Sequence, residues 1–498
     1  MKKYLLLSLA ALSLAATASA EPSFKRGLAE GNFSTRAEMD QLVDGVSWFY
    51  NWSTRPNSGA NNEVADNDTW EFCPMTWNGN FSEDAIREYV RSHPKTKYIL
   101  GFNEPNFIDQ AHMTPHDAAE VWPRVKAVAD ELGLQVVSPA VNNSSWSEWS
   151  DPVKWMREFI RLAGIDNVDY IAFHAYGGMG NITDTATRLW NEFHKPLWLT
   201  EFCNWPGGAG ATYVAPETQM AAMVEMVKWC EKTEYLYRYS WFQAFEKSHN
   251  FTNPSSSHVC PNYFLYEPEY YKDENNKTKV RWAINDRGKV YKWLGTYDKN
   301  VWHTADGSFV NAGDCIDHSS VSMVPSTCTL STRPIDINSF QNGSYVDYQF
   351  NVPSAGEYTL TLVASGFGEP TRFDAKIAVY TVDANGNESN VSAQQTLALP
   401  NDDARYNSYY FPCTLAAGNQ TIRVKCEYHP NGMRLAGVKL GLTAGIDNVS
   451  ADRDDLNTPC DIFDLQGRRV MSNVIVDDVK SQLPAGIYVA NGRKIAVR

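Results

Sequence analysis

Short apolar runs alternate with amphipathic stretches over the first 300 residues. The runs are continuously apolar, which is the pattern of strands buried on both faces of a parallel sheet. They are FKRGL (24–28), VSWFYNW (46–52), EFCPMTW (71–77), KYILGFNE (97–104), LQVVSPA (134–140), VDYIAFHAY (168–176), LWLTEF (197–202) and YLYRYSWF (235–242). Eight strands that alternate with helices over roughly 250 residues predict a (β/α)8 barrel.

Helix signals fill most of the intervals between these runs. In 151–164, Asp151 is a candidate N-cap, Pro152 takes the first helical position and Gly164 ends the helix. The stretch 113–133 begins similarly, with Thr114 and Pro115 at its front. A final turn and helix are predicted for 281–300.

The pattern changes after about residue 305 to short strands separated by turns. YVDYQFNV alternates as a half-solvated strand does, and QNGS, PSAGEY and DANGNE provide turns. Two further strand pairs around glycine turns follow residue 444. The predicted fold class is therefore α/β: a (β/α)8 TIM barrel in 21–304, a β-sandwich domain in 305–443 and a small C-terminal β segment in 444–498.

The first 20 residues have the features of a secretory signal peptide. Lys2 and Lys3 precede an apolar stretch, and Ala18-Ser19-Ala20 is a small-residue cleavage site. We expect a secreted or cell-surface protein, because no later apolar run reaches membrane-spanning length. The formal net charge of −14 makes nucleic acid an unexpected partner.

The chain has nine cysteines, an odd number that leaves at least one thiol unpaired within the chain. Export permits disulfides, and Cys315 with Cys328 and Cys413 with Cys426 are the candidate local pairs. There is no C-x-x-C or H-E-x-x-H motif, so no metal and no other cofactor is expected.

Two glutamates end buried runs: Glu104 ends the fourth and Glu201 the seventh. In a (β/α)8 barrel the carboxyl ends of the strands carry the active site, so the two side chains are expected to converge. A carboxylate is costly to bury without a partner or a function. A glutamate that merely begins a helix is also common, so Glu104 alone would indicate little. Two carboxylates at one barrel end predict glycoside hydrolysis.

Further candidates for substrate binding lie beside these acids. Asn103 is a candidate amide donor to a sugar hydroxyl. His174 is expected to bond the nucleophile or a sugar hydroxyl, or else to be structural. Four aromatic residues at strand ends, which could stack on sugars or pack in the core, complete the predicted site: Trp52, Trp77, Tyr176 and Trp241.

The ordered motifs SWFYNW, FCPMTW, ILGFNEPN, VVSPA, IAFHAY, LWLTEF and RYSWF resemble glycoside hydrolase family 128, the Asl1-like catalytic domains. This resemblance implies a clan A barrel that cleaves β-1,3-glucan with retention of configuration. It implies Glu104 as acid/base and Glu201 as nucleophile. The sequence departs from the expected pattern at Ala175, where a bulkier aromatic residue is expected. At Cys203, near Glu201, a disulfide to Cys73 or Cys230 is expected.

Two resemblances concern the rest of the chain. Residues 330–443 resemble family 6-like carbohydrate-binding modules, although the sequence does not place ligand residues and a purely structural role stays open. The tail FDLQGRRV…LPAGIYVANGRKIAVR resembles C-terminal sorting segments of Bacteroidetes-type bacteria, or is a small β-domain.

The leading hypothesis is a secreted retaining β-1,3-glucanase with a polysaccharide partner. A β-1,4-glucanase or mannanase of the same clan is the first alternative. A noncatalytic glycan-binding surface protein is the second. Nucleotide enzymes and serine hydrolases are disfavoured, because the chain has no P-loop, Rossmann fingerprint or G-x-S-x-G elbow. Endo or exo action and the oligomeric state stay open.

Overall fold

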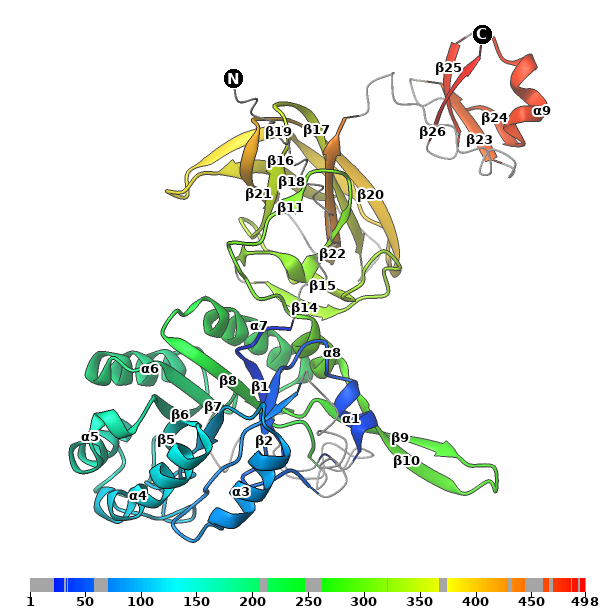
Figure 1. Ribbon diagram of the computed structural model, residues 1–498. Helices are drawn as coiled ribbons and strands as arrows, with labels where there is room; N and C mark the ends of the chain where they lie inside the picture. The colour runs from blue at the N-terminus through cyan, green and yellow to red at the C-terminus, as the bar shows by residue number, and fades with distance from the viewer. Residues whose placement is uncertain are drawn as a thin grey trace, which may run out of the picture. The chain divides into compact units, whose positions relative to one another are not determined.

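The computed structural model describes residues 22–497 except 31–32, 34, 58–69, 207–212, 247–261, 320, 367–373, 429–431, 444–459, 465–468, 485 and 491–492. The predicted signal peptide lies outside the described residues. The chain divides into two compact units, 1–440 and 441–498 (Figure 1). Among the described helices, none is long and apolar enough to cross a membrane.

Eight parallel strands form the first domain, and they confirm the predicted (β/α)8 barrel. They are β1 (Arg26–Ala29), β2 (Trp48–Tyr50), β3 (Glu71–Phe72), β4 (Tyr98–Leu100), β5 (Gln135–Val141), β6 (Tyr170–Tyr176), β7 (Leu197–Cys203) and β8 (Leu236–Phe242). The strand order is β3-β2-β1-β8-β7-β6-β5-β4. An isolated parallel bridge between Met75 and Leu100 joins the two ends of this order and closes the barrel.

Helices surround the strands (Figure 1). They are α1 (Arg36–Asp40), α3 (Glu83–Ser92), α4 (Pro115–Leu132), α5 (Pro152–Ala163), α6 (Met179–Phe193), α7 (Pro216–Lys232) and α8 (Asp286–Trp293). The predicted start of α5 is confirmed, because the Asp151 side chain accepts from the Val153 amide and Pro152 is the first helical residue. Thr114 caps α4 in the same way.

The strands separate two apolar clusters. Trp48 and Tyr50 belong to the cluster inside the barrel, whereas Phe49 between them packs on the helix side. The Trp48 ring fills the space beside Gly27, where a Cβ atom would lie 2.2 Å from the ring. The alternation along each strand therefore decides which side chains can reach the active site.

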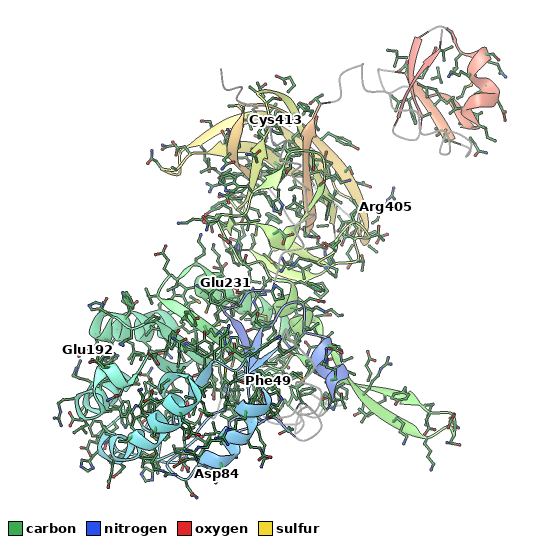
Figure 2. The ribbon with its side chains drawn as sticks, viewed as in Figure 1. Phe49, Asp84, Glu192, Glu231, Arg405 and Cys413 are labelled. Atoms are coloured by element: carbon green, nitrogen blue, oxygen red, sulfur yellow. The ribbon has the colours of Figure 1, made fainter. Side chains whose placement is uncertain are left out.

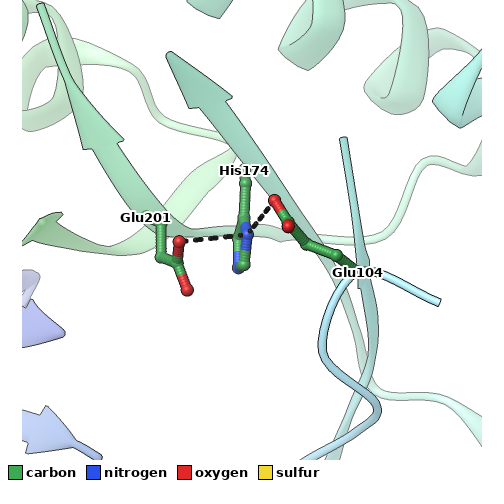
Figure 3. A group of neighbouring side chains, drawn as sticks. All are labelled: Glu104, His174 and Glu201. Carbon is green, nitrogen blue, oxygen red and sulfur yellow. Dashed lines mark hydrogen bonds and ion pairs between the residues drawn. The ribbon is translucent and has the colours of Figure 1, made fainter. Parts of the chain in front are cut away.

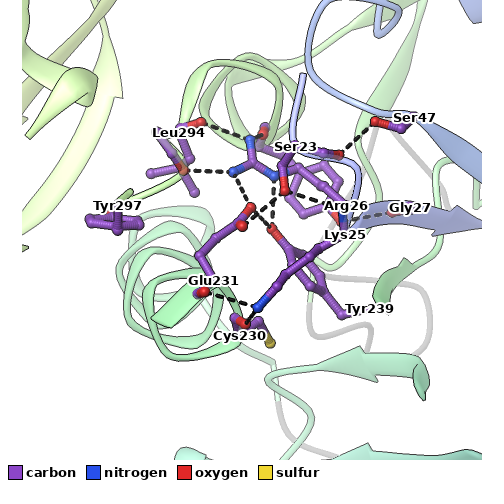
Figure 4. A network of polar contacts seen from close by, with 12 residues as sticks. Ser23, Lys25, Arg26, Gly27, Ser47, Cys230, Glu231, Tyr239, Leu294 and Tyr297 are labelled. Carbon is purple, nitrogen blue, oxygen red and sulfur yellow. Dashed lines mark hydrogen bonds and ion pairs between the residues drawn. The ribbon is translucent and has the colours of Figure 1, made fainter. Parts of the chain in front are cut away.

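A buried arginine joins the barrel to the segment that leaves it (Figure 4). Arg26 donates to Tyr239 Oη at 2.9 Å and pairs with Glu231 at 3.0 Å. Its remaining donors reach the carbonyl oxygens of Tyr291, Leu294 and Gly295. Because each of these contacts satisfies a buried charge or carbonyl, the network ties β1 to α7, β8 and the end of α8.

The prediction for 281–300 was partly wrong. A hairpin of β9 (Tyr266–Lys272) and β10 (Thr278–Ile284) projects from the barrel, and α8 begins only at Asp286 (Figure 1). The turn is fixed by the side chain of Asp273, which accepts from the amides of Asn275 and Lys277. This turn pairs 278–284 with the preceding strand, and Asn285 then caps α8.

Two six-stranded sheets follow the barrel, as the predicted β-sandwich requires. One has the order β11-β16-β21-β18-β19 with β13 beside β16, and the other has the order β14-β15-β22-β17-β20 with β12 beside β22. The strands are β11 (His303–Thr304), β12 (Phe309–Asn311), β13 (Asp317–His318), β14 (Ser322–Pro325), β15 (Ile335–Asn338), β16 (Tyr345–Val352), β17 (Gly356–Gly366), β18 (Asp374–Val382), β19 (Glu388–Ala398), β20 (Asp402–Leu415), β21 (Gly418–Tyr428) and β22 (Met433–Leu442).

The expected disulfides are not formed among the eight described cysteines. Cys413 on β20, labelled in Figure 2, and Cys426 on β21 lie in different sheets of the sandwich. Cys315 and Cys328 belong to different apolar clusters. Likewise, neither Cys73 nor Cys230 is linked to Cys203. All eight are buried, so these cysteines act as small apolar core residues.

The C-terminal unit is a four-stranded sheet in the order β24-β23-β25-β26. Its strands are β23 (Cys460–Asp464), β24 (Arg469–Val474), β25 (Gly486–Ala490) and β26 (Arg493–Val497), and a short helix α9 (Val476–Val479) lies between β24 and β25. Ile462, Val476 and Ala490 are buried in a core of its own. The described strands match the two strand pairs that the sequence predicted.

Candidate active site

Glu104 reaches the inside of the barrel through an irregular turn after β4. Asn103 bridges to Ala140, which faces the barrel interior, so regular alternation would turn the next side chain outward. Instead Glu104 has a φ of 43°, in the left-handed region that non-glycine residues rarely adopt. Strain of this kind is concentrated at functional sites. The Glu104 side chain is buried, and its Oε1 accepts from Asn142 Nδ2 at 2.8 Å.

Glu201 depends on a different irregularity. The β6–β7 pairing passes from Phe173 opposite Leu199 to His174 opposite Glu201, so Thr200 is an extra residue in β7. A bulge re-aims the side chains that follow it. Glu201 thereby shares the inward face of His174, although alternation from Trp198 would point it toward the helices.

Three donors from β2, the segment after it and β6 hold Glu201. Its Oε1 accepts from Tyr50 Oη at 2.9 Å and from Trp52 Nε1 at 2.7 Å, and its Oε2 accepts from Tyr176 Oη. Hydrogen bonds to the charged form favour an ionised carboxylate. The donors from Tyr176 and Trp52 therefore favour the ionised form that a base or nucleophile needs, although burial leaves the pKa of Glu201 raised.

His174 lies between the two carboxylates (Figure 3). Its Nδ1 is 2.9 Å from Glu104 Oε1 and 3.4 Å from Glu201 Oε2. One ligand atom from each of the three residues lies within 4.8 Å of the other two. The three ligand atoms are close enough together to contact one cation. The Glu201 oxygens, however, already accept hydrogen bonds from Tyr50, Trp52 and Tyr176, and these bonds use lone pairs that a cation would need.

The three groups shift one another's pKa values. Burial alone would raise the pKa of Glu104, but the hydrogen bond and charge of His174 outweigh it and lower that pKa. Burial raises the pKa of Glu201, which the His174 charge opposes and the Glu104 charge reinforces. Burial would lower the pKa of His174, but Glu201 and Glu104 raise it. In the ligand-free site the proton therefore favours His174 over Glu104.

Asn142, which sequence reasoning missed, is held by the second asparagine of NEPN. The Asn106 side chain is fully buried, donates to Asn142 O at 2.6 Å and accepts from the Asn142 amide at 3.2 Å. This contact fixes the loop after β5 that carries the amide bonded to Glu104. A polar residue directly after the fifth strand, β5, was the signal that could have identified Asn142.

Asn103 keeps a second side-chain N–H for the predicted contact with a sugar hydroxyl, because its NH2 group has two donors and one of them is used within the protein. Its Nδ2 donates to Gln110 Oε1 at 3.1 Å, and its buried Oδ1 has no partner among the described residues. The role of Asn103 as a donor to the substrate thus stays a prediction.

Three of the four predicted aromatic residues lie at the carboxyl end of the barrel. Trp52 and Trp77 pack against the interior cluster, and Tyr176 contacts Glu201. Trp241 is the exception: it is fully buried on the helix side, and its Nε1 donates to Tyr263 O at 2.7 Å. Strand alternation puts its neighbour Phe242 at the barrel interior instead.

Phe242, which sequence reasoning also missed, packs edge-to-face with Trp52 and Tyr176. Trp205, after β7, lies edge-on to Tyr176 and stacks on Tyr263. These rings form an aromatic border beside Glu201, which suits the flat faces of sugar rings.

Residues 27–267 match the family model described as "Glycosyl hydrolase catalytic core". The match contains β2 to β8, all but the first residue of β1, and the Glu104, His174 and Glu201 cluster. The barrel is therefore similar to the catalytic core of glycosyl hydrolases.

Similar proteins include Alkali-sensitive linkage protein 1 of Schizosaccharomyces pombe (strain 972 / ATCC 24843), which is 27% identical over 230 residues, or 44% of this chain. The chain spans 39% of the length of that protein. Among solved structures, GH128 (subgroup II) endo-β-1,3-glucanases of Pseudomonas viridiflava and Sorangium cellulosum are each 30% identical, with TM-scores of 0.44 and 0.42. The similarity covers 54% of this chain in both cases, and 96% and 97% of those chains.

Proposed function

We propose that the barrel hydrolyses β-1,3-glucan with retention of anomeric configuration. The observation that carries this proposal is the meeting of Glu104, from the turn after β4, and Glu201, from β7, with one oxygen of each within 4.8 Å. Retaining glycosidases hold their carboxyl groups about 5–5.5 Å apart, whereas inverting enzymes need about 6.5–9.5 Å to admit a water.

The contacts divide the roles. Glu201, held by three donors, is the nucleophile: its carboxylate oxygen attacks C1 and forms the glycosyl-enzyme ester. Glu104 gives its proton to the glycosidic oxygen as the C1–O bond breaks. Water then gives a proton to Glu104 and its oxygen to C1, which releases Glu201.

The pKa directions require a proton transfer before this step. The lowered pKa of Glu104 leaves it ionised while His174 holds the proton. Transfer along the 2.9 Å contact from His174 Nδ1 to Glu104 Oε1 yields the neutral acid that the reaction needs. A sugar that fills the site replaces water around Glu104, which disfavours its charged form and drives this transfer.

The choice of polymer rests on the family 128 resemblance of the motifs at the strand ends. A β-1,4-glucanase or mannanase would use the same two carboxylates, so the carboxylate geometry does not distinguish these polymers. Release of reducing ends from laminarin but not from β-1,4-glucan or mannan is the expected outcome. Product lengths would distinguish endo from exo action.

Glu104→Gln and Glu201→Gln test the mechanism. Each variant should lose at least about a thousand-fold in kcat on laminarin while it stays folded, because each removes a group that exchanges a proton or forms a bond. Glu120→Gln, at an exposed position on α4, is the matched control. NMR of the first product should show the β-anomer. Wild-type rates in either site variant, an α-anomer product, or laminarin binding without turnover by the wild-type protein would contradict the proposal.

We further propose that the protein is exported and that residues 444–498 direct its final location. The support is the N-terminal pattern of charged, apolar and small residues and the separate core of the C-terminal unit. N-terminal sequencing of the exported protein should begin at Glu21. Deletion of 444–498 should change the fraction that stays with cells, and an unchanged fraction would contradict the sorting role.

A further inference from the structure

The loop after β5 (143–150) carries a tryptophan that does not belong to the core of the barrel. Trp146 is half-buried, but among the described residues it packs against neither of the two apolar clusters of the barrel. Trp149, three residues further on, packs against the main cluster. The Trp146 ring contacts His112, edge-on with the ring centroids 4.8 Å apart. An indole held half-open in this way offers an apolar face that a sugar ring can cover.

Polar contacts fix the loop that holds this tryptophan. The Trp146 amide donates to Ser144 Oγ at 3.0 Å. The Asn106 side chain donates to Trp149 O at 3.1 Å as well as to Asn142 O at 2.6 Å. Because Asn106 is fully buried, one side chain fixes both the residue that binds the proposed acid and the loop that carries the tryptophan. A ring that is already ordered loses little freedom when a ligand covers it.

Trp146 and His112 lie on the side of the site that carries Glu104. His112 follows Ala111 in the segment after β4, and the Ala111 amide donates to Asn103 O at 3.2 Å. Asn103 directly precedes Glu104 in the sequence. The Trp146 ring therefore lies beside the segment that presents the proposed acid, whereas the aromatic border described above lies beside the proposed nucleophile.

We propose that Trp146 stacks on the leaving segment of the glucan, on the reducing-end side of the bond that is cleaved. This role rests on the proposed function, in which Glu201 attacks C1 and Glu104 protonates the glycosidic oxygen. The sugar attacked at C1 contacts Glu201, and the glycosidic oxygen joins this sugar to the leaving segment. The leaving segment therefore extends from the Glu104 side, where Trp146 lies. Stacking there holds the glycosidic oxygen against the acid, so binding energy from a remote sugar serves the reaction.

Two substrates that differ in their leaving group test this role. Laminarihexaose releases a glucan segment, whereas β-laminaribiosyl fluoride releases fluoride, which has no ring to stack on Trp146. Trp146→Ala is compared with Trp146→Tyr, which keeps a ring, and with Trp302→Ala as the matched control. Trp302, between α8 and β11, is also half-buried and lies outside both clusters in the described part of the chain. Circular dichroism checks that each variant is folded.

We expect Trp146→Ala to lower kcat/KM for laminarihexaose at least about tenfold and to change kcat/KM for the fluoride less than about twofold, because only the leaving segment loses a contact. Trp146→Tyr should stay within about threefold of the wild type on both substrates. Trp302→Ala should match the wild type.

An unchanged kcat/KM for laminarihexaose in Trp146→Ala, or an equal loss on both substrates, would overturn this role and leave the proposed reaction in place. A wild-type protein that hydrolyses neither substrate would instead overturn the proposed reaction, and the role of Trp146 with it.

Discussion

His174 controls where the proton between the two acidic side chains resides. Its raised folded pKa means that it stays protonated above the ordinary value of about 6.5, and it can supply Glu104 by one transfer. In His174→Gln this reservoir is lost. The His174 contacts that lower the pKa of Glu104 are also removed, whereas the Asn142 hydrogen bond that lowers it remains, and Glu104 must then hold the proton itself.

We therefore expect the alkaline limb of kcat/KM for laminarin to lie above pH 6.5 in the wild-type protein and to move to lower pH in His174→Gln. We also expect kcat to fall about ten- to a hundred-fold, because proton transfer to Glu104 loses its donor. Activity profiles from pH 4 to 9 measure both quantities. His116→Gln, at an exposed position on α4, serves as the control. A drop in kcat with an unmoved alkaline limb would assign His174 a packing role only.

Sequence reasoning located the two acidic residues but not the groups that orient them. A carboxylate after an apolar run is conspicuous, because burial requires a partner. The devices that turn Glu104 and Glu201 inward are a left-handed residue and a bulge, and no residue type marks either of them. Asn142 was missed because the fifth apolar run ends before it and its role depends on Asn106.

The strands show why element positions were predictable while facing directions were not. Continuous apolar runs identified all eight strands, and Thr114 and Asp151 marked two helix starts. Strands buried on both faces carry no polar alternation, so the sequence could not tell that Phe242 faces inward and Trp241 outward. The β9–β10 hairpin was missed because its exposed strands lack an apolar run.

Close packing of β4 against β5 sets the position of Glu104. A Cβ atom on Gly101 would lie 2.6 Å from Pro139 N and 2.8 Å from Ser138 O, and both are backbone atoms that cannot rotate away. Gly101→Ala should therefore push the two strands apart and displace Glu104 from Glu201. We expect a loss of about 1–3 kcal/mol in the free energy of unfolding and a fall in kcat of about a hundred-fold.

Urea unfolding and laminarin kinetics check both parts of this prediction. Gly180→Ala on α6 is the matched control, because no atom lies within 4 Å of the added Cβ and its φ is not positive. A Gly101→Ala protein with normal kcat would show that the β4–β5 spacing does not position the acid.

The barrel and the sandwich meet at a buried histidine. His318 on β13 is fully buried, its Nδ1 donates to Ser319 O at 2.7 Å, and its Nε2 accepts from Tyr297 Oη at 3.1 Å. The neutral ring is thus satisfied at both nitrogens. Lys228 of α7 donates to His318 O and pairs with Asp317 at 2.8 Å, so protonation would add a charge beside an existing cation.

Burial, reinforced by the Lys228 charge, lowers the pKa of His318 to about 4. Between pH 6.5 and 4 the unfolded chain therefore binds a proton that the folded protein excludes, so stability is full above pH 6.5 and falls as the pH decreases. The loss in the free energy of unfolding should approach about 3 kcal/mol.

Comparing His318→Gln with the wild type removes the contribution of carboxylates, which titrate in both proteins. The free energy of unfolding, measured from pH 7 to 4, should fall less steeply in the variant, whereas parallel curves would show that His318 does not couple pH to this contact.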